Sequence, residues 1–174
     1  DQGAQQIRRL GRIALLYQYE RVHSRLSTAI RSLMGMRNQS GDDRRLRVII
    51  AASICGGTGS GTFIDVAYLS RHIAMSNATA KSARDIDVIG LLLLPEVFQS
   101  IRTTGEDRIR ANAYASLLDL EYFNQSTNSE DTLYTLTGLK GEKIRVEGAP
   151  FDQCFLIGAS DAGVVNGGGE LAPI

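Results

Sequence analysis

The chain has 174 residues, of which 43% are hydrophobic and 22% charged, and its 19 lysines and arginines balance 19 acidic residues. This is the composition of one ordinary globular domain. It excludes a disordered tail, a collagen and a membrane span, because no apolar run approaches the roughly 18 residues that a span needs. Two distant cysteines, Cys55 and Cys154, give neither a disulfide framework nor a metal-binding spacing, which favours a cytoplasmic location.

Charge is divided unevenly along the chain. Residues 1–47 hold ten arginines and four acids, a net charge of +6, and the remainder is acidic by the same amount. A basic segment can bind a polyanion or can be the solvated face of a helix. Because the arginines are spread out rather than massed, the pattern favours the solvated face, and we expect no nucleic-acid partner.

A long helix is predicted from Ala4 to about Met36, with a weak point at Gly11, because the segment contains no proline. Its apolar residues recur at alternating spacings of four and three, which predicts one continuous buried face. The residues of that face are Leu15, Tyr19, Val22, Leu26, Ala29 and Leu33. The stripe spans fewer than three heptads, so it predicts packing on a sheet rather than a coiled coil.

The rest of the chain alternates between strands and helices. Apolar runs predict strands over 46–54, 86–94 and 153–158, helices over 63–75 and 106–123, a hairpin within 131–147, and a loop over 163–169. The first two strands are apolar on both faces, as in a buried parallel sheet. The alternation predicts an α/β fold, three-layered and Rossmann-like, with a mostly parallel sheet and right-handed crossovers.

A glycine-rich loop joins the first strand to its helix. It contains Gly56, Gly57, Thr58, Gly59, Ser60, Gly61 and Thr62. Glycines let backbone N–H groups point at a ligand, and hydroxyls add donors near the positive end of the helix, so the loop predicts a phosphate site. A Walker loop needs a lysine where Thr62 stands, and the glycine spacing does not fit a dinucleotide fingerprint. A glycine turn that only permits close packing is the remaining alternative, and the glycine density favours phosphate.

The loop from Gly56 to Gly61 resembles the GGGTGSG signature of the tubulin/FtsZ superfamily of GTPases, which wraps the phosphates of the bound nucleotide. Two flanking features agree with it: residues 11–14 resemble the Gly-Arg-Arg-Ala of FtsZ, and the following strand ends at Pro95. The resemblance covers nearly the whole chain and is closest to divergent bacterial tubulin-like proteins. Cys55 departs from the pattern by replacing the first glycine of the signature.

By this resemblance, Gly56 to Thr62 form the phosphate loop, with the amides of Thr58 to Gly61 and the hydroxyls of Ser60 and Thr62 as donors. Residues 3–6, including Ala4 and Gln5, resemble the tail of the loop that senses the terminal phosphate. Glu106 and Arg110 have the spacing of a glutamate and an arginine that reach the nucleotide in FtsZ. Arg108 is an alternative to Arg110, and Glu106 with Arg110 is equally interpretable as a surface ion pair.

Base recognition in the superfamily uses an asparagine beyond the next strand. The corresponding residues here are Ser160 and Asp161, and the nearest asparagine is Asn166. Asp161 is therefore the candidate reader of guanine, and guanine specificity is the least supported part of the resemblance.

The resemblance implies a protein that binds GTP or GDP, with Mg²⁺ held through the nucleotide, and that assembles head to tail into a filament. Hydrolysis would need an acidic loop from the next subunit, so the 174 residues alone are expected to bind weakly and to hydrolyse hardly at all. The first strand of the superfamily domain is expected before Asp1, and the C-terminal domain after Ile174. The alternatives are a tubulin-like scaffold without nucleotide turnover and an ordinary small-ligand α/β domain.

Other residue types give weaker signals. His23 and His72 have no partner at metal-ligand spacing, and neither cysteine has a histidine to activate it, so we predict no metal site and no catalytic residue within the chain. Asp65 is interpreted as a residue in the first helical turn rather than as an indirect Mg²⁺ ligand.

Overall fold

The computed structural model describes residues 4–40, 45–76, 86–98, 105–125, 133–137, 143–158, 164–165 and 171–172. The helices are α1 (Arg8–Tyr17), α2 (Tyr19–Ser40), α3 (Gly57–Met75) and α4 (Glu106–Gln125), with a short 3₁₀ helix, η2, over Pro95–Phe98. The strands are β1 (Leu46–Ser53), β2 (Ile86–Leu93), β3 (Leu133–Thr137), β4 (Lys143–Glu147), β5 (Gln153–Ile157), β6 (Val164–Val165) and β7 (Leu171–Ala172).

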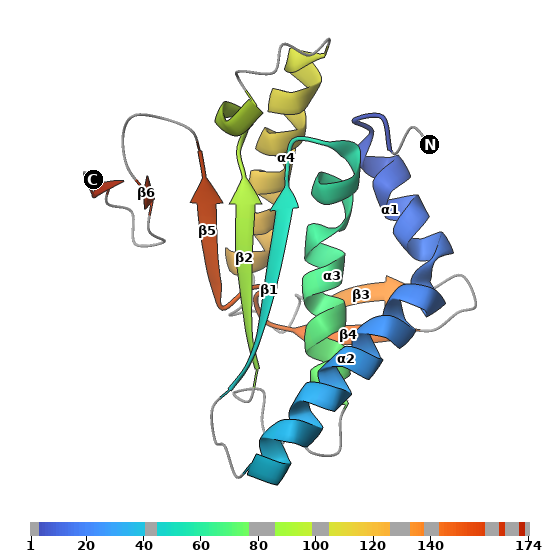
Figure 1. Ribbon diagram of the computed structural model, residues 1–174. Coiled ribbons are helices and arrows are strands. Elements are labelled where there is room, and N and C mark those ends of the chain that lie inside the picture. The colour runs from blue at the N-terminus through green and yellow to red at the C-terminus, as the bar shows by residue number, and fades with distance from the viewer. Residues whose placement is uncertain are drawn as a thin grey trace.

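A parallel sheet forms the centre of the molecule (Figure 1). β1 pairs with β2 so that Ile50 lies opposite Gly90, and β2 pairs with β5 so that Gly90 lies opposite Cys154. β6 and β7 extend the sheet as antiparallel strands, and β3 and β4 form a separate antiparallel hairpin. The predicted α/β class, parallel strands and hairpin are confirmed. The loop predicted over 163–169 is wrong at Val164 and Val165, where two β-branched residues pair with the sheet.

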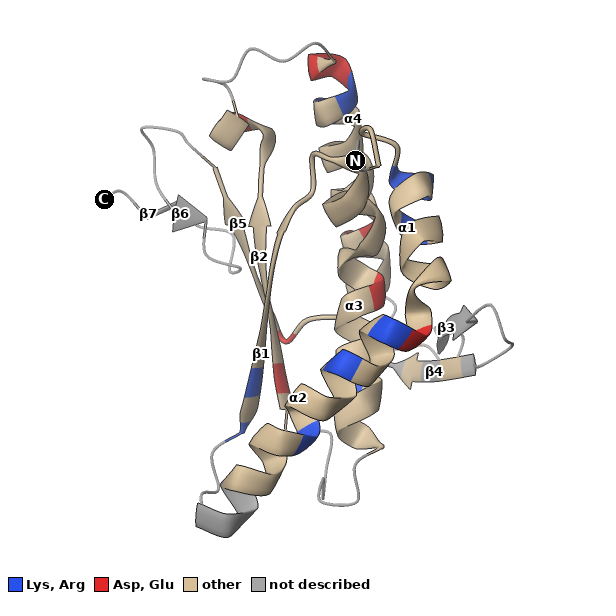
Figure 2. Ribbon diagram, turned by 45° about the vertical axis from the view of Figure 1, so that its right-hand side comes forward, with Lys and Arg blue, Asp and Glu red and all other residues tan. Residues whose placement is uncertain are grey.

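The helices lie on one face of the parallel strands, which is clearest when the sheet is seen nearly edge-on in Figure 2. The β1 side chains that contact the helices are Leu46, Val48, Ile50 and Ala52, while Ile49 between them is 58% exposed. The prediction that β1 is buried on both faces is therefore wrong, because the described helices cover only one face of the sheet. The described residues form two layers, and the third layer of the expected arrangement is not among them.

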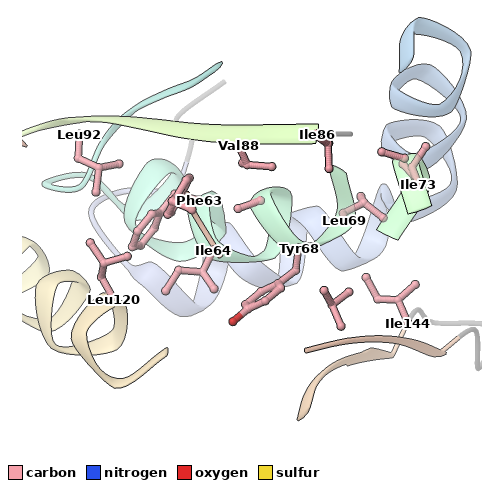
Figure 3. Packing of buried hydrophobic residues seen from close by; sticks show 14 of the residues in the cluster. Phe63, Ile64, Tyr68, Leu69, Ile73, Ile86, Val88, Leu92, Leu120 and Ile144 are labelled. Carbon is pink, nitrogen blue, oxygen red and sulfur yellow. The ribbon is translucent and has the colours of Figure 1, made fainter. Parts of the chain in front are cut away.

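α3 contributes more buried apolar residues to the core than any other described element (Figure 3). Phe63, Tyr68 and Leu69 are each at most 2% exposed, and the ring of Tyr68 packs edge-on against that of Phe123 in α4, with centroids 5.7 Å apart. The ring of Phe63 stacks on that of Phe151, with centroids 6.1 Å apart, and the hydroxyl of Tyr68 donates to the carbonyl oxygen of Gly148 at 2.9 Å. These contacts fix α3, and with it the glycine-rich loop at its start, against the sheet.

The N-terminal segment is two helices rather than the single predicted helix. The chain bends at Gln18, while Gly11 lies within α1. The predicted stripe is correct from Leu15 to Leu26, since Val22 and Leu26 also pack against the core. It is wrong in the last turns of the stripe, where Met34 is buried and Leu33 is 52% exposed. A strict alternation of spacings four and three drifts by about 20° per heptad from the 3.6-residue turn, so the buried face moves on by one residue.

Candidate functional site

The glycine-rich loop lies where β1 ends, and most of it belongs to a helix. α3 begins at Gly57, six residues before the predicted start at Phe63, with Gly56 as its N-cap residue in an extended conformation. Glycine is a poor helix former, but tertiary packing overrides local propensity where neighbouring backbones approach closely. The starts of α1, α3 and α4 all lie at the end of the sheet to which the parallel strands point (Figure 1).

Three of the four glycines are in close contact with neighbouring backbone. A Cβ atom on Gly57 would lie 2.6 Å from the nitrogen of Ile7, and one on Gly61 would lie 2.2 Å from the oxygen of Arg8. On the opposite side, a Cβ on Gly59 would lie 2.1 Å from the carbonyl oxygen of Ser53. Gly56 differs, because its Cβ position has nothing within 4 Å among the described residues. Close packing therefore accounts for three of the glycines, and Gly56 borders open space.

The start of α3 presents backbone donors. The first four N–H groups of an α-helix have no intrahelical acceptor, and here they belong to Gly56, Gly57, Thr58 and Gly59. Within the described residues no side chain caps this end. The amides of Ser60 and Gly61, which the sequence predicted as donors, fall instead within the helical ladder. Uncapped amides at the positive end of a 19-residue helix are suited to an anion.

Two of the three hydroxyl groups of the loop are engaged in the helix itself. Ser60 donates to the carbonyl oxygen of Gly56, and Thr62 donates to that of Thr58 at 2.9 Å. Each hydroxyl has a single hydrogen, so it would have to break this bond before donating to a phosphate. Ser60 is also buried, whereas Thr58 is exposed.

A tight turn at residues 4–7 lies against the glycine-rich loop. Gln5 and Gln6 have φ values of 46° and 59°, in the left-handed region, and the N–H of Ile7 donates to the carbonyl oxygen of Ala4 at 2.8 Å. A Cβ atom on Gly57 would lie 2.8 Å from the Cβ of Ala4. Ala4 is thus next to the start of α3. That Ala4 and Gln5 sense a terminal phosphate stays a prediction.

The same turn is bound to α4. The side-chain amide of Asn112 donates to the carbonyl oxygen of Gln6 at 2.9 Å and to that of Cys55 at 3.0 Å. A Cβ atom on Gly105, the residue before α4, would lie 2.7 Å from Oε1 of Gln6. The starts of α3 and α4 and the turn before α1 therefore form one connected unit.

Glu106 and Arg110 form an exposed ion pair one turn apart on α4, with 2.7 Å between the guanidinium and the carboxylate. This geometry is that of a surface ion pair, which was one of the two interpretations of these residues in the sequence. Arg108 beside the pair is also exposed. The pair is in the first two turns of α4, on the end of the molecule that carries the glycine-rich loop (Figure 2). Asp161, the candidate guanine reader, lies outside the described residues.

Two ion pairs fasten α1 to its neighbours beside the loop. Arg12 makes two hydrogen bonds to Asp65 at 2.9 and 3.1 Å, and Arg8 donates both to the carboxylate of Asp119 and to the carbonyl oxygen of Ser60. Asp65 is in the third turn of α3 and buried, so its interpretation as a first-turn residue is wrong, because α3 starts earlier than predicted. Burial raises the pKa of Asp65 to about 6, against the opposing effect of the Arg12 charge.

Of the two cysteine thiols, Cys55 is buried and Cys154 is half-buried. Burial raises the pKa of the Cys55 thiol, which donates to the carbonyl oxygen of Leu93, and raises that of Cys154 to about 11. Neither thiol is therefore activated as a nucleophile. Within the described parts of the chain, no three metal-ligating side chains lie together, and no helix is long and apolar enough to cross a membrane.

Sequence reasoning missed Asn112, Arg8 and the Arg12–Asp65 pair. Asn112 is a polar residue and a weak helix former, and it stands among alanines on the face of α4 that also carries Ala113 and Ser116. This was the only feature of the sequence that could have indicated its role. Nothing in the sequence indicated which of the N-terminal arginines contact the loop.

Comparison with known proteins agrees with this architecture. A family model described as tubulin-like matches residues 1–166. No curated protein and no solved structure gives a significant match. Since the family model covers nearly all of the chain, and the glycine-rich loop, the parallel strands and the intervening helices occur in the expected order, the chain belongs to the tubulin-like family.

Proposed function

We propose that the protein binds a guanine nucleotide, with the phosphates seated on the start of α3. The observation that carries the proposal is the uncapped helix start at Gly56, at the end of the sheet to which the parallel strands point. In open α/β sheets, ligands bind at the carboxyl ends of the strands, and helix N-termini hold phosphates. Membership of the tubulin-like family supports the choice of GTP or GDP.

The donor set suits a nucleotide polyphosphate. The amides of Gly56 to Gly59 supply N–H donors, and no described residue lies within 4 Å of the Gly56 Cβ position to obstruct an approaching group. Mg²⁺ would be held through the nucleotide and would neutralise phosphate charge when bound. The part of the chain described by the structure supplies positioning and amide donors, which act by electrostatic stabilisation.

Turnover is proposed to depend on assembly. Within the described residues no three acidic or other metal-ligating side chains lie together, and the carboxylates of Asp65 and Asp119 beside the loop are paired with Arg12 and Arg8. Head-to-tail self-association, with an acidic loop of the next subunit reaching the site, would complete a GTPase and form a filament. GTP hydrolysis should then rise more steeply than linearly with protein concentration.

Gly56→Asp is the sharpest test of nucleotide binding. An aspartate at the N-cap accepts hydrogen bonds from the helix amides and is favoured over glycine there by about a few tenths of a kcal/mol, so the variant should be folded and at least as thermostable as the wild type. Its carboxylate would occupy the donors and repel phosphate, so GTP binding measured by titration calorimetry in the full-length protein should be lost. Gly56→Ala is the matched control, because its methyl group meets nothing within 4 Å, and it should retain GTP.

If Gly56→Asp binds GTP as tightly as the wild type, the phosphates do not sit on this helix start. Substitutions at Gly59 are unsuitable for the test, since any side chain there collides with the carbonyl oxygen of Ser53. A folded wild-type protein that binds no nucleotide would overturn the proposal itself.

A second candidate function is a tubulin-like scaffold that does not turn over nucleotide. It is favoured by the packing that accounts for Gly57, Gly59 and Gly61 without any ligand. On this alternative, Gly56→Asp leaves every cellular function intact and does not lower the melting temperature. Loss of function in that variant, with retention in Gly56→Ala, would exclude the scaffold.

A further inference from the structure

We propose that Asn112 is a positioning residue for the phosphate site: its side-chain amide sets the direction of the Gly56 N–H. This inference rests on the proposed nucleotide function. Asn112 lies in the second turn of α4, 57 residues from Cys55 in sequence, and bonds to Cys55 and to Gln6 through one nitrogen.

The two hydrogen bonds use the full donor capacity of that nitrogen. A carboxamide NH₂ has two hydrogens, and at 2.9 and 3.0 Å each hydrogen has one carbonyl acceptor. Asn112 is only partly exposed, so these bonds are partly shielded from water. Replacing the amide by a group that cannot donate would leave two carbonyl groups without this partner.

Planarity of the peptide group transmits the constraint to the helix start. In a trans peptide the C=O and the following N–H point in opposite directions, and the described residues contain no cis peptide. Because Asn112 holds the oxygen of Cys55 toward α4, the N–H of Gly56 points away from α4. That N–H is the first of the four amides that we assign to the phosphates.

The second bond fixes the neighbouring turn by the same geometry. With the oxygen of Gln6 held by Asn112, the N–H of Ile7 points the other way, where it donates to the carbonyl oxygen of Ala4. Gln5 and Gln6 are in the left-handed region, which non-glycine residues adopt only when the surroundings enforce it. Asn112 is one such constraint, and the Gln6 side chain against Gly105 is another.

The test compares Asn112→Asp with Asn112→Ala in the full-length protein. A carboxylate has nearly the same shape as the carboxamide, but it has no hydrogen to donate and repels both carbonyl oxygens. Affinity for GTP with Mg²⁺ should fall about tenfold or more, and more than the affinity for guanosine, which has no phosphates. The control is Asn124→Ala, which removes an asparagine from the last turn of α4. It should leave both affinities unchanged.

Hydrogen exchange of the nucleotide-free protein gives a readout that does not depend on binding. In both Asn112 variants, the amide of Ile7, which is hydrogen-bonded to the carbonyl oxygen of Ala4, should exchange faster, while those of β2 keep their wild-type protection. If Asn112→Asp fails to fold, Asn112→Ala is judged by the same measurements. Wild-type exchange at Ile7, or unchanged GTP affinity in a folded variant, overturns the positioning role. A wild-type protein that does not bind GTP overturns the proposed function, and is recognised separately because the exchange result still stands.

Discussion

Gly11 of α1 faces the carbonyl oxygen of Gly57 at the start of α3, and a Cβ atom on Gly11 would lie 2.1 Å from that oxygen. A second Cβ contact would be with the Cα of Thr58 at 2.9 Å. Because both neighbours are backbone atoms, they cannot move aside by rotating a side chain. The position that the sequence marks as a weak point in a helix is therefore the contact that holds α1 against the glycine-rich loop.

Gly11→Ala should destabilise the protein, although alanine is the better helix former. Pushing α1 away from α3 costs about 1–3 kcal/mol of unfolding free energy, as overpacking does in a close-packed interior. The matched control is Gly35→Ala in α2, where no described atom lies within 4 Å of the Cβ position and the gain in helix propensity should stabilise by about 0.5–1 kcal/mol. Urea unfolding measures both, and equal signs for the two variants would contradict the role of Gly11.

Tyr68→Phe should cost about 1–2 kcal/mol of unfolding free energy. The ring of Tyr68 is fully buried, and its hydroxyl donates to the carbonyl oxygen of Gly148, which the variant leaves without that donor. Tyr114→Phe on α4 is the control, since that ring is 66% exposed and the substitution should be neutral. A thermal melt that does not distinguish the two variants would mean that the Tyr68 hydroxyl contributes nothing to stability.

The order of elements was predictable from the sequence because it depends on local patterns. Apolar runs gave β1, β2 and β5 to within a residue or two, and the spacing of apolar residues gave α4. The start of α3 at Gly57 was not predictable, because helix propensity opposes it and contacts with α1 and Ser53 enforce it. The same holds for burial of β1, since which face of a strand is covered depends on where the helices pack.

The site was predictable only in part, for a similar reason. The glycine density indicates the loop. The sequence does not show that three of its glycines permit close packing while Gly56 borders open space. Asn112 contacts carbonyl groups 57 and 106 residues away, and no local pattern encodes a pairing of that separation. A single sequence shows neither these hydrogen-bond partners nor that Arg12 forms its ion pair with Asp65.

Asp65 should make the free energy of unfolding fall as pH rises. A carboxylate whose pKa is lowered by folding would have the opposite effect. The pKa of Asp65 is raised from 3.8 to about 6, so the folded state holds the proton more tightly, and stability is lost as pH rises through 6. Between about pH 5 and pH 7.5 this contribution is about 1.4 kcal/mol. Asp65→Asn removes it, so the difference in stability between variant and wild type should shift in favour of the variant by that amount.

Arg12→Ala provides the complementary measurement for this pair. Removal of the guanidinium takes away the interaction that opposes the rise in the Asp65 pKa, so the pH at which stability is lost should move upward. Chemical denaturation at a series of pH values follows both variants. An Asp65→Asn profile that runs parallel to the wild type over this range would show that Asp65 is not titrating there.

His72, in the last turn of α3, should change the free energy of unfolding with pH in the direction opposite to that of Asp65. Burial and the nearby charge of His23 lower its pKa from 6.5, so the unfolded state binds the proton more tightly and stability falls as pH drops below about 6.5. His72→Gln should flatten this part of the stability profile, and His23→Gln should reduce its slope by removing the second cause. Because Asp65→Asn changes the profile with the other sign, denaturation of the three variants at matched pH separates the two groups, and an unchanged acid slope in His72→Gln would refute the assignment to His72.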